Sequence, residues 1–318
     1  MQTRGCRAVS DIWQEVGAMS ATVVIEALSA HCAGCEVAIL DQGELLLDIL
    51  ERISIVHAPI LMDSKYRDPA GDSDVVSIPR ADVGIVSGGI RTEHGLAVAK
   101  AVRESCDILI ANGSCACMGG IPSLANLVPP DVLKQGVPNL EHGVEDGDFE
   151  LPPLTARVAA INEVVPVDIF LPGCPPPTHL FAAALQAVLE GRSFDLPEDT
   201  VCNECSKTKE KRTVFADNGL QFPEMLRPLE TPPLDKRCLI EQGFFCMGAA
   251  TRSGCGARCT QVNMPCRGCM GPKRIGENPR AEMLGALSVY NYALRDVHDR
   301  RAAFNWFTGG HSNLRPVR

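Results

Sequence analysis

The chain has 318 residues and a formal net charge of -9 at pH 7. This acidic balance argues against a nucleic-acid surface, because phosphate binding needs clustered Lys and Arg side chains. No apolar run reaches the roughly 18 residues of a membrane helix, and charged residues interrupt the N-terminal segment where a secretory signal would be apolar. We therefore expect a cytoplasmic protein with no membrane span and a sizeable core.

In the first 190 residues, predicted strands alternate with predicted helices. Short β-branched runs indicate strands at 22–28, 53–61, 82–87, 107–111 and 165–171. Apolar spacing indicates a helix within 37–53, and Thr92 and Thr178 are the expected caps of two further helices. This alternation predicts an α/β fold with a doubly wound parallel sheet, whose ligands bind beyond the carboxyl ends of the strands.

The fifteen cysteines are the most informative part of the composition. Thiols stay reduced in the cytosol, so this number indicates metal ligation rather than disulfides. Seven cysteines are spread through the first 190 residues, whereas eight fall between Cys202 and Cys269. The contrast predicts a boundary near residues 193–198, which divides the chain into a domain at 1–195 and a second at 196–318.

Four cysteines of the first domain lie just past predicted strand ends. Cys32 and Cys35 follow the first strand, Cys115 follows the strand at 107–111, and Cys174 follows the strand at 165–171. Four thiolates from three loops at one rim can hold one 4Fe-4S cluster. Each cysteine alone could instead be a core residue, and a lone CxxC also suits a zinc site or a dithiol motif. Each loop carries a glycine that leaves room for a bulky group: Gly34, Gly113 and Gly173.

The second domain shows poor helix and strand periodicity, and its eight thiols divide naturally into two four-ligand sites. With so little apolar pattern, we expect this segment to be held together by its metals. Two zinc sites satisfy the same count, so spacing alone leaves both metals open. A closing helix is expected with Asn278 as N-cap and Pro279 as its first residue, and Trp306 and Phe307 are expected to pack on the body. The stripe of the closing helix is Met283, Leu287, Tyr290 and Leu294.

Three cysteine motifs, in a fixed order, resemble the small subunits of NiFe hydrogenases. They are CxGC at 32–35, GxCxxxGG at 113–120 and GCPP at 173–176. The resemblance extends over nearly the whole chain and is closest to the cytoplasmic methyl-viologen-reducing group, the partner of heterodisulfide reductase. It implies a flavodoxin-like domain followed by an irregular C-terminal domain that binds iron-sulfur clusters. Further matching stretches lie at 88–94, 201–205, 238–243, 250–257 and 265–269.

The resemblance also implies three 4Fe-4S clusters, with ligands assigned by motif order. The proximal set is Cys32, Cys35, Cys115 and Cys174. The medial set is Cys255, Cys259, Cys266 and Cys269. The distal set is Cys202, Cys205, Cys238 and Cys246. Respiratory relatives have histidine at the first distal position and proline at the position of Cys259; cysteine at both favours lower potentials, because thiolate adds negative charge.

By this resemblance the chain is an electron-transfer subunit of a NiFe hydrogenase, and the nickel-iron site lies in a separate large subunit. Electrons would pass through the proximal, medial and distal clusters to a low-potential acceptor. The implied partners are that large subunit, an iron-sulfur delta-type subunit, and a heterodisulfide-reductase-like or other acceptor module. Glycine-rich loops at 88–94 and 118–123 are the expected interface with the large subunit, and Arg91 is among their few charges.

Other interpretations remain open at this stage. A sister hydrogenase that uses a deazaflavin, sulfur or NAD(P) would have a similar small subunit. A quinone-reductase subunit of the respiratory complex type shares the first domain but has adjacent cysteines in place of CxxC, and a zinc-stabilised scaffold would have no redox role. Glu36 and Glu93 could relay protons, but caps or salt-bridge residues are the expected roles. Three cysteines have no assigned cluster: Cys6, Cys106 and Cys117.

Overall fold

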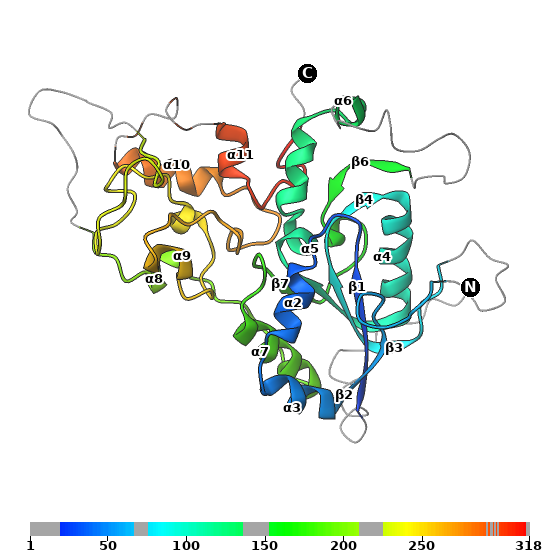
Figure 1. The fold of residues 1–318 in the computed structure, drawn as a ribbon. Helices are drawn as coiled ribbons and strands as arrows, with labels where there is room; N and C mark the ends of the chain where they lie inside the picture. The colour runs from blue at the N-terminus through cyan, green and yellow to red at the C-terminus, as the bar shows by residue number, and fades with distance from the viewer. Residues whose placement is uncertain are drawn as a thin grey trace, which may run out of the picture.

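The protein is described by a computed structural model that covers residues 20–66, 76–135, 153–209, 225–290, 292, 295, 297 and 299–315. Figure 1 shows a sheet flanked by helices and, beside it, a region of short helices and loops formed by the C-terminal part of the chain. None of the described helices is long and apolar enough to cross a membrane. The acidic stretch with Glu141, Glu145, Asp146, Asp148 and Glu150 lies outside the described residues, as do Cys6 and Leu294.

The central sheet consists of five parallel strands. They are β1 (Ala21–Ala27), β2 (Ile53–His57), β3 (Ala81–Ser87), β5 (Cys106–Asn112) and β7 (Ile169–Leu171), arranged as β2-β1-β3-β5-β7. Counted along the chain, this is the 2-1-3-4-5 order of flavodoxin-like doubly wound sheets. The predicted α/β class and parallel sheet are confirmed. A separate antiparallel pair joins β4 (Ile90–Thr92) to β6 (Leu154–Ala159).

Helices cover both faces of the sheet (Figure 1). Val23 of β1 packs in an apolar cluster with α2 (Gly34–Leu40) and α7 (Thr178–Leu189), and α3 (Leu45–Arg52) lies on the same side. Val24, which points to the opposite face, packs in a second cluster with α4 (Glu93–Ser105). Because both faces are covered, loops at the carboxyl ends of the strands are the places for a binding site. At that end lie α5 (Ser114–Met118), η1 (Ile121–Leu127), α6 (Pro130–Gln135) and η3 (Ile161–Glu163).

The first predicted helix differs from the structure. The span 37–53 contains two helices, α2 and α3, because the chain turns at Gly43, whose φ of 62° is poorly tolerated by other residues. Ile53 begins β2 instead of ending a helix. The strand then ends at His57, because the carbonyl of Ala58 accepts hydrogen bonds from the following turn.

The strand predicted at 165–171 is also shorter than expected. The N–H of Val165 donates to the carbonyl of Ile161, and Pro166 has no N–H to offer a neighbouring strand, so β7 begins at Ile169. Thr92 does cap α4, where its hydroxyl accepts from the N–H of Gly95 at 3.0 Å. Thr178 is the first residue of α7 and makes no capping hydrogen bond.

The C-terminal region has an apolar core of its own, which the poor periodicity of the segment did not predict. Phe244, Leu239, Met283 and Leu287 are buried in one cluster. Periodicity failed to reveal it because these residues come from loops and from short elements. The closing helix begins at Arg280, one residue later than predicted, and Asn278 Oδ1 accepts from the Arg280 N–H. The elements are α8 (Val201–Glu204), η4 (Met247–Ala250), α9 (Arg258–Gln261), α10 (Arg280–Val289) and α11 (Arg300–Phe304).

The tail of the chain returns to the sheet. The N–H of Gly310 donates to Met118 O at 2.8 Å, and His311 Nε2 lies 2.8 Å from Asn162 Oδ1. Phe307 is buried as expected, whereas Trp306 stays partly exposed. The tail therefore packs next to α5, the helix that carries Cys115.

Candidate metal centres

The four cysteines of the proximal set meet at the carboxyl edge of the sheet. Cys32 and Cys35 lie in the loop after β1 and at the start of α2, Cys115 lies in α5 after β5, and Cys174 lies just after β7. Burial raises the pKa of the Cys35 thiol, and the charges of Glu36 and of the other three cysteines raise it further. Burial likewise raises the pKa of Cys115 to about 12, with added contributions from Cys174 and Cys32. The four sulfurs therefore lie close enough to interact electrostatically.

Two glycines shape the space around these sulfurs. A Cβ at Gly113 would collide with Cys35 Sγ, and a Cβ at Gly120 would collide with Cys115 Sγ. Both glycines also have positive φ, 92° and 57°, which disfavours a side chain. Glycine at these two positions lets the backbone approach the thiols closely, as expected of loops that wrap around a bulky inorganic group held by those thiols.

Buried polar groups lie behind this rim, and the sequence reasoning identified only one of them. Glu36 accepts a hydrogen bond from Ser87 Oγ through Oε1, while its Oε2 has no partner among the described residues, and burial raises the pKa of Glu36. Glu26 accepts from the Tyr66 hydroxyl at 2.8 Å and lies 3.1 Å from His57 Nε2. An acid within the buried run TVVIEAL was the available signal for this cluster. Glu36 is thus a buried hydrogen-bonding residue rather than a surface salt-bridge residue.

The four cysteines of the distal set line one small cavity, together with Lys207, Lys209 and Gly248. Burial raises the pKa of Cys202, Lys209 opposes this shift, and the charges of Cys238 and Cys205 add to it. A Cβ at Gly248 would lie 3.5 Å from Cys202 Sγ and 3.7 Å from Cys246 Sγ. The structure therefore brings Cys202, Cys205, Cys238 and Cys246 together around one cavity, which Gly248 also lines.

The medial set lies between the other two. Burial raises the pKa of Cys269 to about 12. A hydrogen bond from the Cys174 backbone opposes this shift, whereas the negative charges of Cys255, Cys259 and Cys174 add to it. The Cys269 carbonyl also accepts from Ser114 Oγ at 2.6 Å, which links it to the proximal loops.

On the other side of the medial set, the N–H of Cys266 donates to Cys246 Sγ at 3.2 Å. Burial raises the pKa of Cys266, and the charges of Cys246 and Cys269 contribute in that order. Contacts thus run from the proximal set to Cys269 and from Cys266 to the distal set.

Glu204, inside the Cys202–Cys205 pair, holds the loop that carries Cys255. Its Oε1 accepts from the Gly254 N–H at 2.7 Å and its Oε2 from the Gly256 N–H at 3.0 Å. One carboxylate therefore ties a distal ligand pair to a medial ligand loop. Sequence reasoning missed this role because the two segments are fifty residues apart.

Cys106 and Cys117 do not join any of these sets. Cys106 is 3% exposed in the core, and burial raises its pKa to about 11. Cys117 is completely buried and its Sγ donates to Ala111 O at 3.3 Å, so Cys115 is the thiol that faces the rim. Within the described residues, no three His, Cys, Asp or Glu side chains are placed to hold a single metal ion.

Comparisons with known proteins place this chain in a family. The family described as NADH ubiquinone oxidoreductase, 20 Kd subunit, matches residues 32–188. A vhu-type F420-non-reducing hydrogenase subunit of Methanococcus voltae is 37% identical over 282 residues, which are 87% of this chain and 91% of the relative. The F420-non-reducing hydrogenase iron-sulfur subunit of Archaeoglobus profundus is 34% identical over 268 residues, 77% of this chain and 80% of the relative.

A solved structure, described as the NAD+-reducing [NiFe]-hydrogenase in the H2-reduced state, aligns with a TM-score of 0.46 and 28% identity. The alignment covers 56% of this chain and 96% of the chain in that solved structure. The sheet and the sequence relatives define the class of this chain as the small subunit of a NiFe hydrogenase, an oxidoreductase. Within that class, it belongs to the family of small subunits of the F420-non-reducing hydrogenases.

Proposed function

We propose that the chain carries three 4Fe-4S clusters and passes electrons between the NiFe site of a separate large subunit and a low-potential acceptor. The observation that best supports this proposal is the order of the cysteine sets, in which the medial set lies between the proximal and distal sets. Cys174 and Ser114 contact Cys269, and Cys266 contacts Cys246, so neighbouring sets meet pairwise. When bound, such clusters take up and release single electrons, and close spacing favours transfer between them. The name of the Archaeoglobus profundus relative includes iron-sulfur, which supports this cofactor class.

In this proposal the ligands are the twelve cysteines of the three sets. The proximal set lies at the sheet edge with Gly113 and Gly120 beside it, and the distal set lines one cavity. The division into domains 1–195 and 196–318 goes with this assignment, since the first holds one set and the second holds two. The cytoplasm, where thiols stay reduced, is the proposed location.

The large subunit is proposed to cover the proximal rim and α2, which begins at that rim, and to extend over α3. Eight of the seventeen exposed large apolar side chains in the described residues fall between residues 37 and 62. Val37 is 62% exposed and Leu47 is 65% exposed. Exposed apolar side chains gathered in one stretch of the chain favour a protein interface, and a permanent interface should bury more than about 2,000 Å². Burial there would also shield the proximal site from oxidants.

The expected role of Arg91 changes with the structure. Its guanidinium donates to Thr155 O at 2.7 Å and so ties β4 to the strand beside it. Replacing Arg91 would disturb this contact as well as any interface. An exposed leucine such as Leu47 is therefore the better probe of the large-subunit interface.

For the acceptor, we propose an iron-sulfur or heterodisulfide-reductase-like module. The names of several relatives, which contain F420-non-reducing, disfavour a deazaflavin acceptor. A nicotinamide acceptor is the second candidate. The delta subunit of the NAD-reducing hydrogenase HoxS of Cupriavidus necator is 33% identical, although over only 52% of this chain.

The test is metal analysis of the purified hydrogenase complex. About twelve irons and as much acid-labile sulfide should be assigned to this subunit, from four per cluster. Hydrogen should reduce all three clusters, as followed by electron paramagnetic resonance. Zinc in place of iron, or only about four irons, would defeat the proposal.

A further inference from the structure

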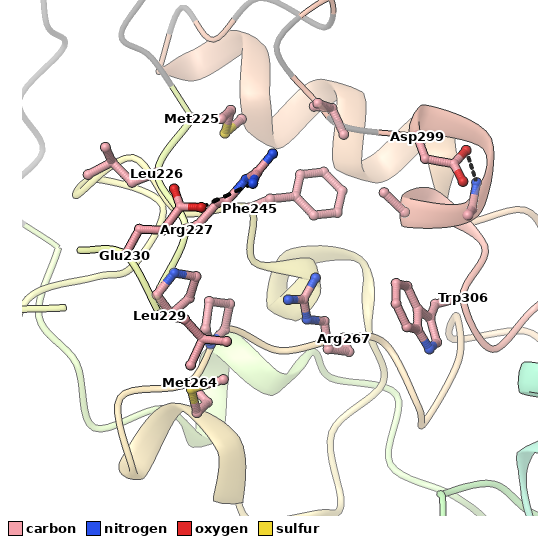
Figure 2. Close-up of a pocket in the computed structure, with 15 residues that line it drawn as sticks. Met225, Leu226, Arg227, Leu229, Glu230, Phe245, Met264, Arg267, Asp299 and Trp306 are labelled. Carbon is pink, nitrogen blue, oxygen red and sulfur yellow. Dashed lines mark hydrogen bonds and ion pairs between the residues drawn. The ribbon is translucent and has the colours of Figure 1, made fainter. Parts of the chain in front are cut away.

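A groove of about 930 Å³ opens in the C-terminal region, and its described lining residues lie between Met225 and Trp306. Figure 2 shows Arg267 in the middle of it, between Trp306 on one side and Leu229 and Met264 on the other. The guanidinium of Arg267 stacks over the Trp306 ring at 5.6 Å from its centroid. None of the described cysteines lines this groove. It is therefore distinct from the cavity of the distal set.

The groove nevertheless adjoins two cysteine sets. Phe245 lines it and directly precedes Cys246 of the distal set, while Arg267 lines it and directly follows Cys266 of the medial set. These two cysteines are linked by the hydrogen bond from Cys266 N–H to Cys246 Sγ at 3.2 Å. A molecule seated in the groove would thus lie against the two chain segments that join these sets.

The lining has the composition of a protein interface core. Such cores are enriched in aromatic residues, Met and Arg and depleted in Lys and acids. Among the described residues, the lining contains two aromatic residues, two methionines and two arginines, but no lysine. Leu229 is 94% exposed and Trp306 is 37% exposed, so neither is accounted for by the core of this chain.

Both acids of the described lining already have partners. Glu230 is paired with Arg227 at 3.0 Å, and Asp299 accepts from the Ala302 N–H at the start of α11. Arg267, by contrast, presents its charge on the Trp306 ring within the groove (Figure 2). The formal charges of the described lining balance, and the guanidinium of Arg267 lies over an aromatic ring in an otherwise mainly apolar groove.

Basic residues are concentrated in the part of the chain that forms the groove. Residues 225–318 carry 14 Lys and Arg against 7 Asp and Glu, whereas the whole chain carries 30 against 39. The part that forms the groove is thus basic within an acidic subunit. Electrostatic complementarity then selects an acidic partner and speeds its encounter with this face.

We propose that this groove docks an acidic protein segment with apolar anchors, contributed by the subunit that exchanges electrons with the distal end of this chain. The inference rests on the proposed function, because it takes the cysteine sets as the electron path. The anchors fill the space between Trp306, Phe245 and Met264, and acids of the same segment face Arg267 and Arg227. Docking here places the partner against residues that directly neighbour Cys246 of the distal set and Cys266 of the medial set.

Photocrosslinking in cells identifies the occupant directly. Leu229→p-benzoylphenylalanine in the full hydrogenase should form a covalent product, on irradiation, with a subunit other than the large one. Mapping should place the crosslink in a segment richer in acids than in bases. Val289→p-benzoylphenylalanine is the control, since Val289 is 58% exposed and outside the groove. A crosslink within this chain, to a second copy or to the large subunit, or no crosslink, would overturn the inference.

A matched pair of charge reversals tests the electrostatic part. Arg227→Glu breaks an exposed i,i+3 ion pair in the groove, and Arg274→Glu breaks an exposed i,i+3 pair, with Glu277, outside it. We expect Arg227→Glu to lower acceptor reduction relative to reduction of a small viologen dye by about tenfold, and to flatten its salt dependence. Arg274→Glu should change neither. Equal behaviour of the two variants would overturn the docking site.

The two proposals fail in different ways. Wild-type enzyme without iron-sulfur absorbance, or without hydrogen-dependent dye reduction, would refute the electron-transfer function. Wild-type enzyme with both properties, in which Arg227→Glu behaves like Arg274→Glu, would leave the function standing and refute the groove.

Discussion

Replacing Gly113 with alanine should remove the proximal cluster and leave the medial and distal clusters in place. Gly113 has φ 92° and ψ 160°, a region in which residues with side chains are strained by about 1–3 kcal/mol. The new Cβ would also collide with Cys35 Sγ, so that sulfur must leave its place among the other three. The distal cavity does not include either residue and should be unaffected.

Gly43→Ala provides the matched control. Gly43 also has positive φ, 62°, but a Cβ there meets no atom of the described residues within 4 Å. Its cost should be the backbone strain alone, about 1–2 kcal/mol, with no sulfur displaced. Both variants thus carry a similar backbone penalty, and they differ in the collision with a thiol.

The assay is iron content and electron paramagnetic resonance of the purified complex, together with hydrogen-dependent dye reduction. Gly113→Ala should lose about four irons, the proximal signal and the dye reduction, whereas Gly43→Ala should keep all three. A Gly113→Ala enzyme with full iron and an unchanged proximal signal would refute the placement of Cys35 at this rim.

Four further outcomes are expected. Cys259→Pro should give a three-iron signal from the medial site in electron paramagnetic resonance of the oxidised enzyme, because one iron loses its thiolate ligand. The variant should still fold, since Cys259 lies in the first turn of α9, where proline is tolerated. A spectrum identical to that of the wild type would contradict the assignment of Cys259 as a ligand. Glu204→Gln should lower the free energy of unfolding by about 1–2 kcal/mol, because it weakens the two charge-assisted hydrogen bonds from the Gly254 and Gly256 N–H groups. Thermal unfolding and iron content should show a lower unfolding midpoint and less iron at the medial site. An unchanged unfolding midpoint would contradict this role of Glu204. Leu47→Asp should weaken binding of the large subunit by about tenfold or more in a pull-down, whereas Leu234→Asp, at a similarly exposed leucine of the C-terminal region, should not. Burial lowers the pKa of His311, although the charge of Glu163 opposes this shift, so the folded state binds the imidazole proton less readily than the unfolded state does. The free energy of unfolding should therefore fall as the pH drops below about 6.5, the usual pKa of histidine. His311→Gln should reduce this dependence of stability on pH, as measured by unfolding at several pH values.

The order of elements in the first domain could be predicted from the sequence. Runs such as TVVIEAL and DVGIVS are buried on both faces, so their apolar character is continuous and easy to recognise. The three loops with Cys32, Cys115 and Cys174 could be assigned to one edge, because parallel strands have their carboxyl ends on the same side. Local conformation was predicted less well, as at Gly43 and Pro166, where one residue redirects the chain.

Tertiary structure decided what depends on residues far apart in the chain. The core around Phe244 and Met283, the Glu204 clamp and the contact between Ser114 and Cys269 have no local periodicity to reveal them. The same is true of the groove between Leu229 and Trp306, whose two walls are separated by more than seventy residues. The sequence alone determined which thiols are available and in what order, because motif spacing is local. Folding decided which of them face one another, because that depends on contacts between distant segments.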